Sequence, residues 1–250
     1  QHGDVAGQFD GIGLYRSELP FMLTDSFPTE LDQTDSYQIL LEQYQKLPVT
    51  MRTLDIGGDK QLNYFPIVED NPFLGWRGIR LTLDHPEIFL MQIRAMLRAN
   101  LHTQNLRIML PMISAIEEVV EAKLLIHQAW NEMKYELGLS AQAFPLPQIG
   151  VMVEVPSSIF IIRQLAGLID FISIGSNDLI QYLLAVDRNN NRVSSLFDSY
   201  HPAVLQCLKM IIDGAHHNKL EVSICGELAG DPIGSMILLG LGYDKLSMNA

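Results

Sequence analysis

Cysteine and positive charge are both scarce in this chain of 250 residues. Two cysteines, Cys207 and Cys225, are too few for a disulfide framework and are typical of a reducing compartment. Lysine and arginine together number 17 against 29 aspartates and glutamates, which gives a net charge of −12. Because nucleic-acid backbones require the opposite sign, this balance excludes a general nucleic-acid surface. An anionic ligand would have to be met by positive charge gathered locally.

Long apolar runs are missing as well. No uninterrupted apolar segment reaches the length that spans a bilayer, and the first residues lack the charged and apolar regions of a signal peptide. We therefore expect a soluble, cytoplasmic protein without membrane association. Since 48% of the residues are hydrophobic, the chain can fill a sizeable core and disorder is not expected.

Apolar runs of strand length alternate with segments of helical spacing along the chain. We predict one α/β domain over residues 1–250, a (β/α)₈ TIM barrel, because eight strand and helix units in 250 residues match that fold. An open doubly wound sheet is the alternative, but the sequence lacks a Gly-x-Gly-x-x-Gly turn between a strand and a helix. The predicted strands are 11–18, 50–56, 71–80, 107–112, 150–155, 171–175, 221–225 and 245–249.

Two of the predicted strands run into a carboxylate. Glu154 lies in GVMVEVP at 150–156, and Asp178 ends DFISIGSND at 170–178. Because the C-terminal ends of parallel strands meet at one rim of a barrel, we expect these two acids to lie together. Two oxygen ligands with a phosphate nearby are a common Mg²⁺ site. From the residue alone, a structural salt bridge explains Glu154 as well as metal ligation does.

Other polar residues follow the predicted strands at the same rim. Taken singly, an arginine there is better explained as solvated or paired with an acid, whereas several together favour an anionic substrate with phosphate or carboxylate groups. Cys225, judged from spacing alone, is better explained as a small buried hydrophobe than as a reactive thiol. The polar residues of this rim are Arg16, Arg52, Asp55, Arg77, Asn177, Glu227 and Asn249, with Arg188 in the loop beyond the sixth strand.

A series of ordered motifs resembles the phosphoenolpyruvate-binding barrel of Enzyme I of the bacterial phosphotransferase system. The resemblance runs from about residue 10 to the end, and the segments GWRGIRLTLDHPEIFLMQIRAMLRAN and DRNNNRV are most similar to its nitrogen-related branch. The motifs are LYRSE at 14–18, MRTLDIGGDK at 51–60, NPFLGWRGIR at 71–80, LPM at 110–112, VMVEVP at 151–156, FISIGSNDL at 171–179, LAVDRNN at 184–190, CGELAGD at 225–231 and LSMN at 246–249.

The resemblance implies a role for each matched position. Asn177 is expected to contact the phosphoryl group, and Cys225 is expected to protonate the enolpyruvate carbon as pyruvate forms, which replaces the structural explanation of that cysteine. Asp55 and Lys60 are expected only to support the site. The resemblance implies that Arg16, Arg52, Arg77 and Arg188 surround phosphoenolpyruvate, and that Glu154 and Asp178 ligate Mg²⁺.

One motif of that family is missing. The family transfers the phosphoryl group to a histidine in Gly-Gly-x-Thr-Ser-His on a domain before the barrel, and then to a histidine-containing phosphocarrier protein, but this motif does not occur here. We therefore expect a fragment that does not turn over alone. The resemblance implies that it binds phosphoenolpyruvate with Mg²⁺ and forms a homodimer. The alternatives are the related barrel of pyruvate phosphate dikinase or phosphoenolpyruvate synthase, and a phosphoenolpyruvate sensor without catalysis.

Overall fold

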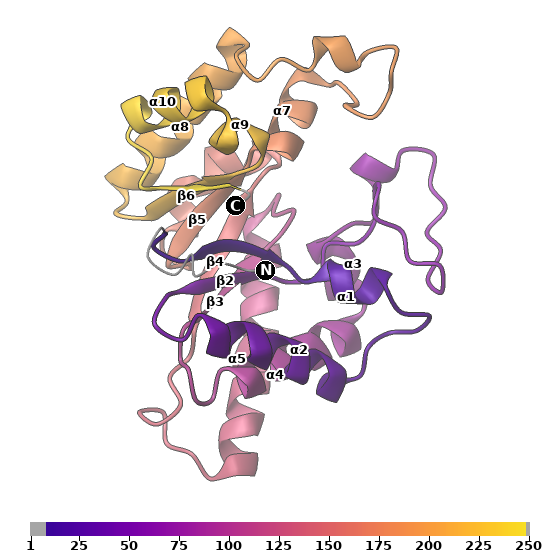
Figure 1. Ribbon diagram of the computed structural model, residues 1–250, viewed down its shortest axis with the longest axis vertical. Coiled ribbons are helices and arrows are strands. Elements are labelled where there is room, and N and C mark those ends of the chain that lie inside the picture. The colour runs from indigo at the N-terminus through magenta and orange to yellow at the C-terminus, as the bar shows by residue number, and fades with distance from the viewer. Residues whose placement is uncertain (1–8, 249–250) are drawn as a thin grey trace.

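A single parallel sheet organises the computed structural model, which describes residues 9–248 (Figure 1). Its seven strands follow one another around the sheet in sequence order, each paired in parallel with the next. The side chains of β2 to β6 are almost all buried, as expected for a sheet covered on both faces. The strands are β1 Ile12–Arg16, β2 Val49–Arg52, β3 Leu106–Leu110, β4 Gln148–Val153, β5 Phe171–Gly175, β6 Glu221–Cys225 and β7 Lys245–Ser247.

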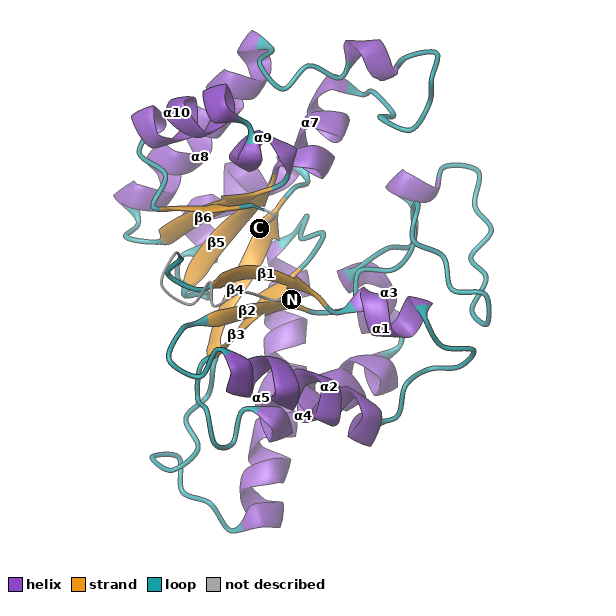
Figure 2. Cartoon of the chain, viewed as in Figure 1, coloured by secondary structure: helices purple, strands orange, loops and turns teal. Residues whose placement is uncertain are grey.

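Helices between the strands cover the outside of the sheet (Figure 2). α2, α4 and α5 lie on one side of it, and α8 and α10 lie on the other. Several begin with proline at the first turn, where the missing N–H costs no hydrogen bond. The helices are α1 Glu18–Met22, α2 Glu30–Gln43, α3 Ile79–Asp84, α4 Pro86–Ala99, α5 Ile116–Leu137, α6 Ile162–Leu165, α7 Ser176–Leu184, α8 Pro202–His217, α9 Glu227–Gly230 and α10 Pro232–Leu241, with short 3₁₀ turns at Pro72–Leu74, Pro156–Ile161 and Ser194–Leu196.

The inside of the sheet is packed at the N-terminal end of its strands. The ring of Phe171 lies over Gly150, where an added Cβ would be 2.4 Å from the ring. The guanidinium of Arg107 stacks on the ring of Phe171, 3.8 Å from the ring centroid. Since this end is filled, the open space inside the sheet lies at the C-terminal ends of the strands.

The predicted third strand, 71–80, is wrong. The segment forms a 3₁₀ turn at Pro72–Leu74 and then α3, because Gly78 has φ 58° and ψ −126°, a backbone conformation outside the strand region. The sheet therefore has seven strands, and within residues 9–248 no backbone ladder joins β7 to β1.

The two edge strands nevertheless lie side by side. A Cβ added to Gly13 of β1 would lie 2.7 Å from the Cβ of Ser247 in β7. The predicted barrel architecture is confirmed as a nearly closed parallel barrel. The last residue of the predicted final strand, Asn249, lies outside the described residues. None of the helices in the described part of the chain has both the length and the apolar character needed to cross a bilayer.

Candidate functional site

A cavity of about 890 Å³ opens at the C-terminal ends of the strands. It brings together residues from β1, β2, β4, β5 and β6 that are far apart in the sequence. Of the predicted site residues, only Arg77 is absent from its walls. The others line the cavity: Arg16, Arg52, Glu154, Asn177, Asp178, Arg188 and Cys225.

Arg77 lies beneath the cavity, with no solvent-accessible surface. Its guanidinium donates to Asp55 through Nε and Nη2 at 3.1 and 3.2 Å, and through Nη2 to Asp178 Oδ2 at 2.8 Å. The hydroxyl of Tyr182 lies 3.5 Å from Nη1 and itself donates to the carbonyl of Phe73. Two carboxylates and a tyrosine thus fix this buried cation on the chain segment that was predicted to be a strand.

Asp55 is the centre of the charged cluster under the site. Besides Arg77, it binds Arg52 Nη1 at 3.1 Å and Lys60 Nζ at 2.6 Å. Burial alone would raise the pKa of this carboxyl, but the positive charges of Arg52, Arg77 and Lys60 hold it well below its usual range. The resemblance implied only a supporting role for Asp55 and Lys60. In the structure Asp55 contacts two of the four predicted arginines directly.

Glu18 is a member of the cluster to which the sequence analysis gave no role. It is 1% exposed, accepts from Arg52 Nη2 at 2.6 Å, and lies 3.0 Å from Lys60 Nζ. The signal available in the sequence was its place in LYRSE, two residues after Arg16 and just past the end of β1. An acid at that rim position is expected to pair with a cation from the neighbouring strand end.

Asp178 lies in the first turn of α7, between two of the predicted arginines. Arg77 binds its Oδ2, and Arg188 Nη1 binds its Oδ1 at 3.0 Å. Burial acts to raise the pKa of Asp178, but the positive charges of Arg77 and Arg188 outweigh it, so the pKa is lowered. Asp178 is therefore a carboxylate at neutral pH.

Glu154 has one oxygen that no described residue satisfies. Its Oε1 accepts the backbone N–H of Met112 at 2.7 Å, whereas its buried Oε2 has no partner among residues 9–248. A Cβ at Gly175 would lie 2.6 Å from Oε2, so the absence of a side chain there leaves space for this carboxyl. Burial, together with the negative charges of Asp178 and Asp55, raises the pKa of Glu154 to about 8. The charges of Arg52 and Arg77 act in the opposite direction, but no cation of residues 9–248 forms an ion pair with Glu154.

The Glu154 and Asp178 pair fits a hard divalent cation of the Mg²⁺ type. Such an ion takes few protein ligands, all of them oxygens, and completes its shell with water and substrate phosphate. The unsatisfied Oε2 of Glu154 supplies one such oxygen on the cavity wall, and Asp178 supplies a second carboxylate on the same wall. Within residues 9–248 no cluster of three or more histidine, cysteine or acidic side chains could hold a metal ion by itself, so water and substrate oxygens would have to complete the coordination shell.

Cys225 ends β6 on the inner wall of the cavity and is 6% exposed. Its Sγ donates to the carbonyl of Ile174 at 3.3 Å, and burial raises the pKa of the thiol to about 11. Gly226 follows with φ 106°, and a Cβ there would lie 2.2 Å from Ser176 Oγ. Only glycine lets the chain leave the strand at this point. At neutral pH the thiol therefore carries its proton next to the cavity.

Asn177 and Arg16 complete the predicted set. Asn177 Oδ1 accepts the N–H of Glu227 at 3.3 Å, and its amide nitrogen has no hydrogen-bond acceptor among residues 9–248. Arg16 is exposed at the end of β1 and makes no ion pair with any residue of the described range. Arg16 is thus the predicted arginine whose charge is not already neutralised by a carboxylate.

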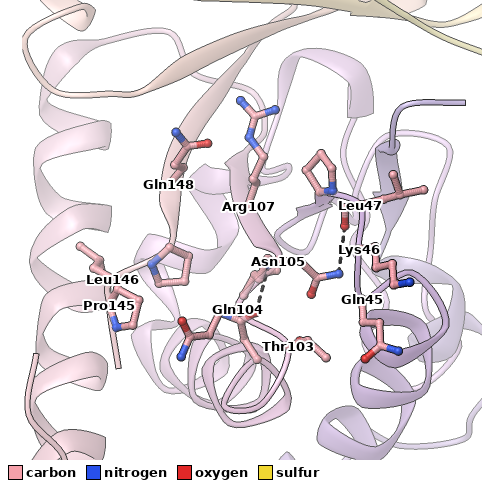
Figure 3. A pocket seen from close by; sticks show the side chains of 14 residues that line it. Gln45, Lys46, Leu47, Thr103, Gln104, Asn105, Arg107, Pro145, Leu146 and Gln148 are labelled. Carbon is pink, nitrogen blue, oxygen red and sulfur yellow. Dashed lines mark hydrogen bonds between the residues drawn. The ribbon is translucent and has the colours of Figure 1, made fainter. Parts of the chain in front are cut away.

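A second, smaller cleft of about 410 Å³ lies at the opposite end of the strands and contains none of the predicted residues (Figure 3). Its centre is Asn105, whose amide donates to the carbonyls of Leu41, Tyr44 and Leu47 at 3.2, 2.8 and 3.0 Å. These bonds tie the end of α2 to the start of β3. The cleft therefore lies among the segments that lead into the strands, and its hydrogen bonds hold these segments together.

The chain that forms the first cavity is similar to proteins of a known family. The model of the PEP-utilising enzyme, PEP-binding domain, where PEP is phosphoenolpyruvate, matches residues 2–250. The chain belongs to this family. A Salmonella typhimurium protein named phosphoenolpyruvate-dependent phosphotransferase system is 56% identical over all of this chain. The Bacillus subtilis phosphoenolpyruvate-protein phosphotransferase is 47% identical over 96% of it. The chain spans only 33% and 42% of the lengths of these two relatives.

Solved structures of low sequence identity share the fold of this PEP-binding domain. An HpcH/HpaI aldolase from Desulfitobacterium hafniense superimposes with a TM-score of 0.53, at 12% identity, over 98% of this chain and 80% of its own. A Haloferax volcanii malate synthase superimposes with a TM-score of 0.54, at 10% identity, over 86% of this chain and 56% of its own. These likenesses support the barrel assignment alone.

Proposed function

We propose that this chain binds phosphoenolpyruvate together with Mg²⁺ and serves as the phosphoenolpyruvate site of a phosphoenolpyruvate-protein phosphotransferase. The observation that carries the proposal is the convergence of seven predicted site residues on one cavity, with the eighth, Arg77, directly beneath it. The names of the relatives that are 56% and 47% identical support the same reaction. Phosphoryl transfer itself belongs to the longer protein, of which this chain is proposed to be the C-terminal barrel.

The arginines supply charge and shape for the anionic substrate. Arg16 and Arg188 both lie on the cavity wall. Arg16 has no carboxylate partner among residues 9–248, whereas Arg188 binds Asp178 through Nη1 at 3.0 Å and has its Nη2 3.8 Å from Asp59 Oδ2. Planar guanidinium groups bind phosphate and carboxylate in bidentate fashion. Arg52 and Arg77 are held by Glu18 and Asp55, so their guanidinium groups are fixed in place at the site without having to reorganise when a ligand binds.

Glu154 and Asp178 are the residues that would hold the metal ion. When bound, Mg²⁺ would neutralise charge on the transferring phosphoryl group. The amide nitrogen of Asn177, free of protein partners in the described range, would donate to the same group.

Cys225 is the proposed proton donor. When the phosphoryl group leaves phosphoenolpyruvate for a histidine elsewhere in the longer protein, the remaining enolate needs a proton on carbon to become pyruvate. The thiol, with a pKa of about 11, is protonated at neutral pH, and it would transfer this proton and become a thiolate. The phosphorylated histidine of the longer protein would then pass its phosphoryl group to a histidine-containing phosphocarrier protein.

The setting of the enzyme is proposed from the resemblance. The motifs GWRGIRLTLDHPEIFLMQIRAMLRAN and DRNNNRV support the nitrogen-related branch, which carries a further N-terminal sensory domain. Both cysteines of the chain are free thiols, which supports a cytoplasmic location.

We also propose a homodimer through the barrel. A monomer found by light scattering at micromolar concentration would contradict this proposal.

Isothermal titration calorimetry tests the binding site. We expect phosphoenolpyruvate to bind this chain only when Mg²⁺ is present, and Glu154→Gln or Asp178→Asn to abolish this Mg²⁺-dependent binding. Cys225→Ala should keep the affinity yet abolish pyruvate formation once the histidine-bearing part of the protein is supplied, and Cys207→Ala is the matched control for loss of a buried thiol. Unchanged Mg²⁺-dependent affinity in both carboxylate variants would remove the metal assignment.

A further inference from the structure

Gln92 is a buried polar side chain among the apolar residues of α4. It is 1% exposed, and its neighbours on the inner face of the helix, Phe89, Ile93 and Met96, are completely buried. A carboxamide at such a position costs folding free energy unless all its hydrogen-bonding groups find partners. Gln92 satisfies this condition: Oε1 accepts from Leu54 N at 2.7 Å, and Nε2 donates to Ser17 Oγ at 3.0 Å and Tyr37 OH at 3.1 Å.

Two of these partners lie just beyond the C-terminal ends of β1 and β2. Ser17 stands between Arg16 and Glu18, and Leu54 stands between Arg52 and Asp55. A single side chain of α4 therefore joins the two segments that carry four charged residues of the site.

The hydrogen bond from Leu54 to Gln92 lies directly after the last backbone hydrogen bond between β2 and β3. The N–H of Thr53 makes the last bond to the neighbouring strand, to the carbonyl of Met109 at 2.9 Å. The next N–H, that of Leu54, is held by Gln92 instead. The carboxamide thus continues the fixation of the chain past the end of the ladder, as far as Asp55.

The orientation of Gln92 is itself fixed from α2. The hydroxyl of Tyr37 accepts from Gln92 and donates to Gln33 Oε1 at 3.2 Å, and Gln33 Nε2 donates to the carbonyl of Pro28 at 3.0 Å. Tyr37 is completely buried and Gln33 is 3% exposed. A chain of fully used hydrogen bonds of this kind allows one arrangement of its members.

We propose that Gln92 is a positioning residue of the phosphoenolpyruvate site, one that sets the spacing of the β1 and β2 ends and thereby the placement of Arg16 and Arg52. The inference rests on the proposed function. At the cavity itself the same two segments meet in the Arg52 and Glu18 ion pair at 2.6 Å, a contact that tolerates little relative movement of the strand ends.

Gln92→Met tests this role because methionine keeps the length of the side chain and removes the three hydrogen bonds. We expect the Mg²⁺-dependent affinity for phosphoenolpyruvate to fall about tenfold, because a binding group that is displaced by a small distance contributes much less to binding. The affinity is measured by calorimetry well below the unfolding temperature. Ser17→Ala removes one of the three bonds with little loss of volume. It should weaken binding in the same direction and to a smaller extent.

Asn105→Leu is the matched control. Asn105 is a carboxamide that also makes three hydrogen bonds with the protein, but at the opposite end of the barrel (Figure 3). It should lower the unfolding temperature as Gln92→Met does while leaving the affinity unchanged.

Wild-type affinity in both Gln92→Met and Ser17→Ala would overturn the positioning role and leave Gln92 a purely structural residue. If Gln92→Met does not fold, the affinity of Ser17→Ala decides. Failure of the unmodified chain to bind phosphoenolpyruvate would instead contradict the proposed function, so the two failures are distinct.

Discussion

At the scale of single residues, the thiol of Cys225 shows how burial fits a group to proton donation. Desolvation is the main cause that raises its pKa to about 11; the charge of Arg52 acts in the opposite direction and that of Glu154 in the same direction. A thiol with this pKa is a weak nucleophile at neutral pH, although it faces a substrate-sized cavity. It therefore differs from nucleophilic cysteines, whose pKa is lowered by their surroundings.

The alkylation rate of Cys225 should follow this pKa. In a Cys207→Ser background, we expect the rate with iodoacetamide to rise about tenfold per pH unit without a plateau up to about pH 10, because only the thiolate reacts and its fraction grows with pH below the pKa. A Cys225→Ser protein, which reports Cys207 with its pKa also raised to about 11, is the control. A plateau that begins by about pH 9.5, as an exposed thiol with a pKa of about 8.5 shows, would contradict the buried, protonated state.

The sequence predicted which residues gather at the rim but not how they pair. Arginines and acids at the ends of successive strands had to meet because parallel strands share one C-terminal edge. The spacing could not show that Arg77 would be wholly buried, or that Glu18 and Asp55 would hold Arg52 and Arg77. Those choices depend on side-chain reach in three dimensions, where any of several nearby acids could serve as partner.

At the scale of secondary structure, the wrongly predicted strand at 71–80 has a specific cause. Its large apolar residues, Phe73, Trp76 and Ile79, match strand composition, but Gly75 and Gly78 interrupt it. The backbone of Gly78 adopts the mirror image of the extended region and places the next residue at the start of α3. The strands at 107–112, 150–155, 171–175 and 221–225 contain no glycine with a positive φ and were predicted to within two residues at each end.

Gly78→Ala should therefore disturb both the fold and the site. A Cβ there would lie 3.0 Å from Met112 Cγ and 3.2 Å from Asp55 Oδ1, in a backbone conformation that alanine avoids. We expect a loss of about 2 to 3 kcal/mol in the free energy of unfolding, measured by urea denaturation, and weaker phosphoenolpyruvate binding because Arg77 is the adjacent residue.

Gly138→Ala is the control for that substitution. Gly138 ends α5 with φ 63° and ψ 29°, and an added Cβ would meet no heavy atom of the described residues within 4 Å. Alanine there should cost about 1 kcal/mol, the penalty of the left-handed conformation alone, with unchanged ligand affinity. Equal losses of unfolding free energy for the two variants would show that the contacts of the added Cβ with Met112 and Asp55 do not lower stability.

At the scale of the whole molecule, the barrel is not uniform around its circumference. β2 to β6 are buried along almost their whole length, whereas every residue of β1 and β7 is at least partly exposed. β7 pairs with β6 but not with β1 within residues 9–248, so the backbone groups along this seam have fewer protein partners. Arg16 emerges at the seam, which links this edge of the barrel to the substrate cavity.

Amide hydrogen exchange followed by mass spectrometry should reveal the seam. Exchange requires opening of the backbone hydrogen bond, and opening costs least where burial is low and pairing is one-sided. We expect peptides covering β3, β4 and β5 to exchange slowest, and peptides covering β1 and β7 to exchange at least about tenfold faster. Phosphoenolpyruvate with Mg²⁺ should slow exchange in β1 through its contact with Arg16. Protection of β1 equal to that of β4 in the free protein would mean that β7 and β1 are joined by a hydrogen-bonded ladder in solution.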